Sequence, residues 1–267
     1  MGIKKVTSLH GLGLRLLYEQ VVDFILPPYS LITGQPIRYG PQKNAIEEDA
    51  LKPWQNISFL DAPCCDLCGF PFEFDQGEAV LCGQCLVRPP RYDRGRSAIV
   101  YNEFSKKLVL DFKHGGRTDG VDFFARQMVR AGRRFLHEMD FLVPVPLHRA
   151  RLRKRRFNQS ALLARQISLL SGLPYECSLL QRVKNTPSQG IQSFAQRKKN
   201  VRAAFRICPQ NVEKIKGANI VLIDDVLTSG ATLEACALTL KKAGASQVNI
   251  LTLMRVVRTH TPKNTDQ

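Results

Sequence analysis

Along the second half of the chain, short apolar runs typical of buried strands alternate with stretches in which apolar residues recur at helical spacing. The apolar runs predict strands over about 97–101, 141–145, 201–207, 219–223 and 247–256. The helical spacing predicts helices over about 103–112, 119–137, 150–171 and 231–243. Strands that alternate with helices in this way predict an α/β domain, with a mostly parallel sheet flanked by helices.

The first 90 residues follow a different pattern. Apolar residues recur at helical spacing over 12–26, and a proline pair then ends the predicted helix. Residues 29–60 are rich in Pro, Gly and polar residues, and two further prolines within 88–91 mark a boundary. We therefore expect a small N-terminal domain over 1–90, the α/β domain over 91–260 and a disordered tail over 261–267.

Composition points to a globular protein with a strong positive charge. The 267 residues suffice for one substantial domain and a small one, and 44% of them are apolar. Lysine and arginine number 39 against 23 aspartate and glutamate, which gives a net charge of +16. This excess favours a polyanionic partner, namely nucleic acid, an anionic membrane or a phosphorylated metabolite. A basic surface that serves solubility alone explains it equally well.

The N-terminal sequence lacks the features of an export signal. Its early lysines resemble the start of a signal peptide, but residues 9–28 contain charged side chains and no unbroken apolar stretch. No window approaches the ~20 apolar residues that a membrane span needs. Because clustered thiols favour a reducing compartment, we expect a cytoplasmic protein.

Five of the eight cysteines lie between Cys64 and Cys85, which indicates a local site and not a disulfide framework. Two Cys-x-x-Cys pairs have the spacing of a tetrahedral zinc site, and four sulfur ligands leave no open position for catalysis. The spacing also permits Cys64 in place of Cys65. We take the ligands of one structural Zn²⁺ to be Cys65, Cys68, Cys82 and Cys85.

The strongest motif begins with the apolar run 220–223, which ends in Asp224 and Asp225 and leads through a loop of hydroxyl and glycine residues into a predicted helix. At the carboxyl end of a parallel strand, Thr228 to Thr232 would present backbone N–H groups and hydroxyls to a phosphate. Paired acids would repel a phosphate at contact distance, so they suit sugar hydroxyls, directly or through a Mg²⁺ shell. A capped helix after a buried strand would explain only one of these polar residues.

This motif resembles the phosphoribosyl-pyrophosphate loop of type I phosphoribosyltransferases. Within that superfamily the chain is similar to the ComF family of competence-associated proteins, from about Leu17 to Val256. The resemblance implies a type I phosphoribosyltransferase-like domain behind a small zinc-binding domain. It also implies that the acids bind the ribose hydroxyls, with Mg²⁺, and that the loop holds the 5-phosphate of phosphoribosyl pyrophosphate. The binding residues so implied are Asp224, Asp225, Val226, Leu227, Thr228, Ser229, Gly230, Ala231 and Thr232.

Further segments resemble parts of the same family. Residues 112–117 are similar to its Lys-aromatic-Gly-Gly-Arg turn, with His114 where Tyr is commoner. Residues 143–149 and 156–159 are similar to the segment that lies where related enzymes bind pyrophosphate, and 186–201 resembles the loop that closes over ligand. The pyrophosphate and lid residues implied by the resemblance are Lys113, Pro146, His148, Arg149, Gln189 and Arg197.

The zinc-binding segment departs from the family pattern. Many ComF relatives carry an earlier Cys-x-x-Cys, and here Ser30 and Thr33 stand at those positions. This departure argues for one zinc site and not two.

Two functions remain open. A dense basic run would suit a groove for single-stranded DNA, and its residues are Arg151, Arg153, Lys154, Arg155 and Arg156. The resemblance implies a role in DNA uptake and natural transformation, with a competence helicase or DNA-processing protein as a partner. As an enzyme, the chain would instead transfer a 5-phosphoribosyl group to a nitrogen acceptor and release pyrophosphate. The sequence identifies neither the acceptor nor a catalytic residue.

Overall fold

The computed structural model describes residues 56–106, 120–155, 157–184 and 203–257. All the elements below belong to one compact unit, Ile57–Gln267. Among the described residues, no helix has the length and apolar character that crossing a bilayer requires. Several predictions made from the sequence lie outside the described residues: the helix over 12–26, Lys113, Gln189, Arg197, the side chains of Lys154 and Arg156, and the tail over 261–267.

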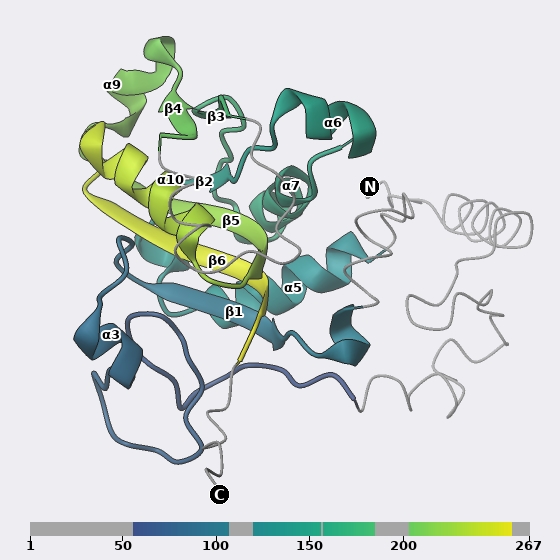
Figure 1. The fold of residues 1–267 in the computed structure, drawn as a ribbon, viewed down its shortest axis with the longest axis vertical. Coiled ribbons are helices and arrows are strands. Elements are labelled where there is room, and N and C mark those ends of the chain that lie inside the picture. Colours follow the sequence, from purple (N-terminus) through teal and green to yellow (C-terminus); the bar gives the residue numbers. More distant parts are fainter. Residues whose placement is uncertain (1–55, 107–119, 156, 185–202, 258–267) are drawn as a thin grey trace, which may run out of the picture. The chain divides into compact units, whose positions relative to one another are not determined.

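A four-stranded parallel sheet forms the centre of the fold (Figure 1), as the alternating pattern predicted. Its strand order is β1-β6-β5-β2. The strands are β1 (Gly95–Val100), β2 (Phe141–Pro144), β5 (Asn219–Leu227) and β6 (Gln247–Arg255). Each strand is mostly buried, since helices cover both faces of a parallel sheet.

Helices α5 (Val121–Gly132) and α7 (Gln159–Ser171) pack on one face of the sheet, and α10 (Ala231–Lys242) packs on the other. Along β5, successive side chains point to opposite faces of the sheet. Ile220 and Leu222 share a core cluster with Leu240 of α10, whereas the side chains between them point to the opposite face. The remaining short elements are α3 (Gly83–Val87), η1 (Leu136–Glu138), α6 (Arg149–Arg155), η2 (Pro209–Asn211) and α9 (Val212–Ile215).

The single helix predicted over 150–171 is wrong: the chain forms α6, breaks, and starts again as α7. Asn158 causes the break, because its side chain caps α7 by accepting from the Ser160 N–H at 3.2 Å. Its amide also donates to the Val145 carbonyl oxygen at 3.0 Å, which ties the start of α7 to the end of β2. The break keeps the basic helix α6 close to the carboxyl end of the sheet.

The strand predicted over 201–207 does not join the central sheet. Within the described residues, β4 (Phe205–Ile207) pairs antiparallel with β3 (Leu180–Arg182) in a separate two-stranded sheet. The pairing places Arg182 opposite Phe205, with the guanidinium 5.5 Å from the centre of the ring. A cation over an aromatic face is attracted by the ring's quadrupole, so this contact fixes the direction of the Arg182 side chain.

The segment that carries the clustered cysteines packs directly on the sheet. The Leu60 N–H donates to the Ala98 carbonyl at 2.8 Å, and the Gly95 N–H donates to the Leu67 carbonyl at 2.7 Å, so residues 58–67 run along β1. Cys65 and Cys85 belong to the same buried cluster as Ile250 of β6. The domain boundary predicted near residue 90 stays a prediction, and the two sides of it share a core.

The connections of the sheet diverge between β5 and β2. After β5 the chain crosses through α10 to β6 on one side, whereas after β2 it crosses through α7 to Tyr175, which pairs with Leu142 on the other side. A crevice therefore opens at the carboxyl ends of β5 and β2. Ligands of open α/β sheets bind in such crevices.

Candidate functional site

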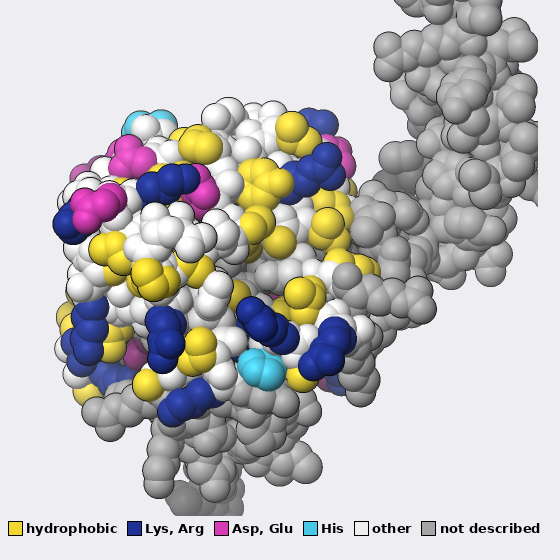
Figure 2. All heavy atoms as spheres, turned by 90° about the horizontal axis from the view of Figure 1, so that it is seen from above, with side chains coloured by type: hydrophobic (Ala, Val, Ile, Leu, Met, Phe, Trp, Pro, Cys, Tyr) yellow, Lys and Arg dark blue, Asp and Glu magenta, His cyan; other side chains and the backbone are white. Residues whose placement is uncertain are grey.

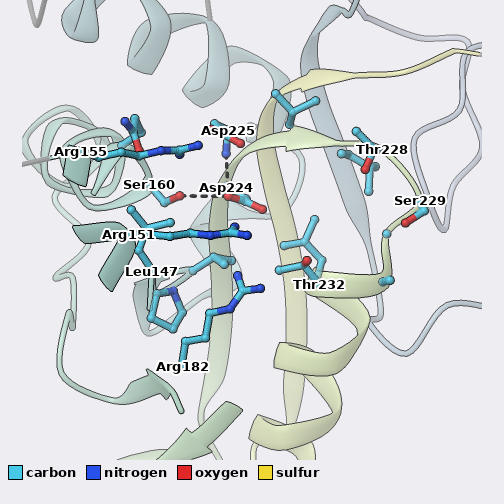
Figure 3. A pocket seen from close by; sticks show the side chains of 18 residues that line it. Leu147, Arg151, Arg155, Ser160, Arg182, Asp224, Asp225, Thr228, Ser229 and Thr232 are labelled. Carbon is cyan, nitrogen blue, oxygen red and sulfur yellow. Dashed lines mark hydrogen bonds between the residues drawn. The ribbon is translucent and has the colours of Figure 1, made fainter. Parts of the chain in front are cut away.

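A pocket of about 230 Å³ occupies this crevice (Figure 3). Its described lining comes from the end of β2, from α6 and α7, from β3, and from the β5–α10 segment. The lining residues are Val145, Pro146, Leu147, Arg151, Arg155, Gln159, Ser160, Arg182 and the continuous stretch 224–233. The whole motif singled out in the sequence, Asp224 to Thr232, thus lies in one pocket.

The loop between β5 and α10 forms one side of the pocket. It turns at Gly230, whose φ of +75° lies in the left-handed region that residues other than glycine rarely adopt. The next residue, Ala231, begins α10, so the free N–H groups and the positive end of the helix dipole lie at the pocket. Thr228, Ser229 and Thr232 add hydroxyl groups (Figure 3). This loop has the chemistry of a phosphate cradle.

The two acids lie in the last four residues of β5, which is longer than predicted because β6 pairs with it as far as Leu227. One oxygen of Asp224 accepts both from the Ser160 hydroxyl at 3.0 Å and from the Asp225 N–H at 2.9 Å. These bonds hold the carboxylate in a fixed orientation at the pocket. Both acids are half-buried, so their charges are only partly screened.

Three arginines extend into the pocket from the side opposite the phosphate loop, and Figure 3 shows them pointing towards the acids. Arg151 and Arg155 come from α6, and Arg182 comes from β3, where only 9% of it is exposed. Burial and then the charge of Arg155 lower the pKa of Arg151. Burial and then the charge of Arg151 lower the pKa of Arg182. The charge of Arg151 is thus disfavoured by Arg155 and disfavours that of Arg182, and an anionic ligand would relieve this repulsion.

The pocket therefore offers a phosphate cradle, two carboxylates and a group of guanidiniums in one place. Guanidiniums bind phosphate oxygens with paired charge-assisted hydrogen bonds. Asp224 and Asp225 are too few for a magnesium cage, since Mg²⁺ takes six oxygen ligands and is usually held jointly by one or two carboxylates and substrate phosphates. The donor set fits a phosphorylated sugar that brings Mg²⁺ with it.

The structure separates the residues that the sequence had grouped. Pro146 lines the pocket, whereas His148 and Arg149 are not part of its described lining. His148 Nδ1 accepts from the Ala150 N–H at 3.3 Å and so stabilises the start of α6. Arg151 and Arg155, predicted to bind nucleic acid, line the pocket, while Arg153 of the same helix is exposed outside it.

Sequence reasoning missed two lining residues, Arg182 and Ser160. Ser160 follows the cap residue Asn158, and the Asn-Gln-Ser sequence could have indicated a helix start beside the pocket. Arg182 sits on a three-residue strand and carried no detectable signal.

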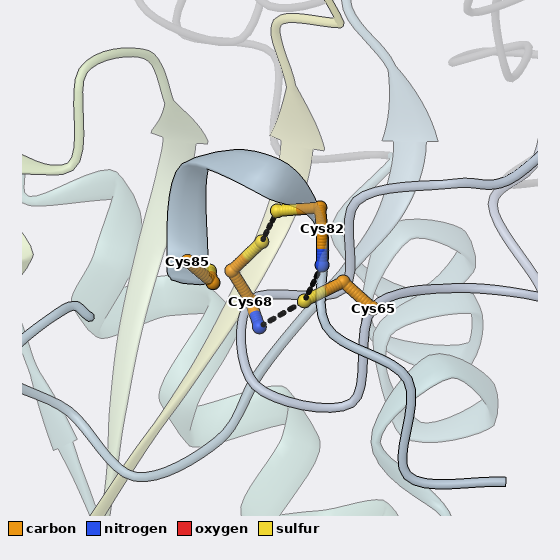
Figure 4. Close-up of side chains that lie close together, drawn as sticks. All are labelled: Cys65, Cys68, Cys82 and Cys85. Carbon is orange, nitrogen blue, oxygen red and sulfur yellow. Dashed lines mark hydrogen bonds between the residues drawn. The ribbon is translucent and has the colours of Figure 1, made fainter. Parts of the chain in front are cut away.

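A second candidate site is formed by four buried cysteine sulfurs, which all lie within 4.8 Å of one another (Figure 4). They belong to Cys65, Cys68, Cys82 and Cys85, the set predicted. Four sulfurs about 2.3 Å from a tetrahedral Zn²⁺ would be about 3.8 Å apart. The sulfurs of Cys68 and Cys82 are 3.7 Å apart. Cys64 is outside the cluster and pairs through its backbone with Pro71.

The surroundings act differently on the individual sulfurs, and only Cys65 is held towards the thiolate. The backbone N–H groups of Cys68 and Cys82 donate to the Cys65 sulfur at 3.5 and 3.3 Å. A hydrogen bond with Cys68, followed by those backbone bonds, lowers the pKa of Cys65 to about 4. The same hydrogen bond with Cys65, together with burial, raises the pKa of Cys68, and burial raises the pKa of Cys85 to about 12. Four thiolates this close require a bound cation, and the donor set fits structural zinc.

Two buried arginines connect this cysteine cluster to the sheet. Arg255, at the end of β6, donates to the Cys68 carbonyl, and its second nitrogen lies 3.5 Å from the Cys68 sulfur. Arg96 of β1 donates to the carbonyls of Cys65 and Asp66 at 3.4 and 3.0 Å. Their positive charges offset the negative charge that a zinc tetrathiolate retains.

Basic side chains are also gathered on the surface. On the face in Figure 2, Lys and Arg spread across one half with few acids among them, while Asp and Glu gather near the opposite margin. Arg149 and Arg153 of α6 are among the exposed residues. A polyanion could therefore contact α6 outside the pocket.

Comparison with known proteins finds relatives that share most of the chain. The phosphoribosyl transferase domain family matches residues 140–266. The DNA utilization protein YhgH of Salmonella typhimurium is 32% identical over 198 residues, which cover 72% of this chain and 84% of that protein. Competence protein ComFC of Bacillus subtilis is 31% identical over 202 residues, covering 72% and 77%. Competence protein F of Haemophilus influenzae is 29% identical over 198 residues, covering 72% and 85%. The extent of these matches shows that the chain belongs to the ComF family and has the type I phosphoribosyltransferase fold.

Proposed function

We propose that this protein binds a 5-phosphoribosyl-pyrophosphate-type ligand with Mg²⁺ and acts in DNA uptake, where it holds single-stranded DNA. One observation carries the ligand: the phosphate loop, the paired acids and the three arginines all line the same pocket. A ligand with a phosphate at one end, a sugar in the middle and a pyrophosphate at the other matches these three sets of groups in order.

Each part of the ligand has a partner of suitable charge. The loop from Thr228 to Thr232 takes the 5-phosphate through backbone N–H groups and hydroxyls. Asp224 and Asp225 accept from the ribose hydroxyls, and their charge attracts the ligand's Mg²⁺. The guanidiniums of Arg151, Arg155 and Arg182 neutralise the pyrophosphate.

The proposed role in DNA uptake rests on the relatives and on charge. Two of the similar proteins are named competence proteins and another is named a DNA utilization protein. The net charge of +16 and the exposed arginines of α6 suit the phosphate backbone of single-stranded DNA. A DNA-processing protein or helicase would be the partner, and the thiol cluster suits the cytoplasm.

The donor site is tested by calorimetry with phosphoribosyl pyrophosphate and Mg²⁺. The variant Asp224→Asn/Asp225→Asn replaces two charged acceptors without changing their size. Each lost charge-assisted hydrogen bond costs ~1.5 to 3 kcal/mol, so binding should weaken by roughly two orders of magnitude or more. Equal donor affinity in the wild-type protein and this variant, with thermal unfolding unchanged, would refute the proposal.

A second candidate function is phosphoribosyl transfer to a nitrogen acceptor. The observation that favours it is the group of three arginines, because cations around a leaving pyrophosphate stabilise the charge that develops on it. A pyrophosphate-release assay across candidate bases separates the two functions. Donor binding without pyrophosphate release from any base would identify a ligand-binding protein and not a transferase.

A further inference from the structure

A carboxylate stands immediately beside the phosphate loop. Glu234 is in the first turn of α10, and its backbone N–H donates to the Gly230 carbonyl at 2.8 Å. A Cβ atom built on Gly230 would lie 3.9 Å from Oε1 of Glu234. Only 18% of the Glu234 side chain is exposed, so water screens its charge incompletely.

This carboxylate opposes the loop's proposed ligand. An acid in the first turn stabilises a free helix by its interaction with the helix dipole. A phosphate bound at this helix end would accept from the free N–H groups of the first turn. It would carry a negative charge, as Glu234 does. Like charges near each other in a partly buried site repel more strongly than in open water. The site therefore needs a cation close to Glu234.

Arg88 is that cation. Its Nη2 atom lies 3.1 Å from Oε2 of Glu234, with 40% of the Arg88 side chain exposed. Arg88 comes from the cysteine segment, three residues after Cys85, and forms the C-cap of α3 with its N–H bonded to the Gln84 carbonyl at 2.9 Å. Pro89 follows and disfavours the helical conformation for Arg88, whose φ is −146° and ψ 89°. The cysteine segment thus delivers one guanidinium to the phosphate-binding helix.

We propose that Arg88 is a positioning residue of the phosphate site. By neutralising Glu234 and holding it against α10, Arg88 lets the loop from Thr228 to Thr232 accept a phosphate dianion. The inference rests on the proposed function and extends it, because it makes the cysteine segment part of the site. Arg88 acts through Glu234 and not on the ligand.

A double-mutant cycle tests this relation, with ribose 5-phosphate and pyrophosphate as separate calorimetric probes in the presence of Mg²⁺. Arg88→Gln leaves the Glu234 charge unopposed and should weaken ribose 5-phosphate binding roughly five- to tenfold, as expected for a charge pair partly open to solvent. Glu234→Gln should bind at least as tightly as wild type. The double variant should return to within about twofold of Glu234→Gln.

Controls separate this effect from loss of structure. Arg94→Gln removes a guanidinium of similar exposure that pairs with Glu138 at 3.5 Å, and it should leave binding unchanged. Arg88→Lys keeps the charge and should retain most of the affinity. Pyrophosphate binding should change less than ribose 5-phosphate binding in Arg88→Gln, because the arginine group takes pyrophosphate.

The outcomes distinguish the inference from the proposed function. Wild-type affinity in Arg88→Gln, or a double variant as weak as Arg88→Gln, overturns the role of Arg88 while the donor site stands. If the wild-type protein binds none of ribose 5-phosphate, pyrophosphate and phosphoribosyl pyrophosphate, both the role of Arg88 and the proposed donor site are overturned.

Discussion

The arginines of α6 allow the pocket and the DNA surface to be tested separately. Arg151 and Arg155 line the pocket, whereas Arg153, between them in sequence, is exposed outside it. Arg151→Gln and Arg155→Gln each remove one guanidinium that would face the pyrophosphate, while Arg153→Gln removes the same charge from the same helix. The three variants therefore differ in position and not in net charge.

The magnitude follows from the burial of each group. A hydrogen bond to a charged partner contributes about 1.5 to 3 kcal/mol, and the lower end applies to half-buried side chains that water still reaches. Arg151→Gln and Arg155→Gln should each weaken donor binding about tenfold. Arg153→Gln should change it less than twofold.

Calorimetry with phosphoribosyl pyrophosphate and Mg²⁺ measures these affinities, and thermal unfolding checks the fold. If Arg153→Gln weakened donor binding as much as its two neighbours did, net charge and not pocket geometry would account for the affinity. That result would refute the assignment of Arg151 and Arg155 to the ligand.

Three further predictions concern the loop, the metal and DNA. Gly230→Val and Gly172→Val both place a branched side chain at φ near +75°, so each variant should lose about 1 to 3 kcal/mol of stability. Only Gly230→Val should abolish donor binding, as calorimetry would show. The protein prepared reduced and without chelator should contain about one Zn²⁺ per chain by metal analysis. The variant Cys82→Ser/Cys85→Ser should lose this zinc, and Cys64→Ser should keep it. The reverse pattern would exclude this ligand set. Single-stranded DNA binding should weaken steeply with salt, and Arg151→Gln/Arg153→Gln/Arg155→Gln should reduce the salt dependence; a titration insensitive to both would show that α6 does not contact DNA.

Local patterns predicted the parts of the site that are continuous in sequence. The four apolar residues before Asp224 are typical of a strand buried on both faces, and the Thr-Ser-Gly-Ala-Thr sequence that follows fits a phosphate loop at a helix start. The structure has this strand, loop and helix start across 224–232, and ligand binding there stays a prediction. The same holds for the spacing of the cysteine pairs.

Features that depend on tertiary pairing were out of reach. Arg182 enters the pocket because β3 pairs with β4 and sets its guanidinium over Phe205, and neither strand is long enough to show a period. The choice between Cys64 and Cys65 depends on a backbone bridge with Pro71, since adjacent residues of an extended segment point to opposite sides. The break between α6 and α7 was readable at Asn158, but the helix-forming residues on both sides obscured it.

The contact between Arg255 and Cys68 joins two points at opposite ends of the described chain, and this has a consequence for how the protein is made. A ribosome synthesises the cysteine loop early, but Arg255 and the strand that carries it emerge only near the end of translation. Until then, the cysteine sulfurs lack the guanidinium of Arg255 and the complete sheet on which their loop packs. We expect a nascent chain that stops before β6 to bind zinc weakly, and we expect the affinity for zinc to rise once β6 has joined the sheet.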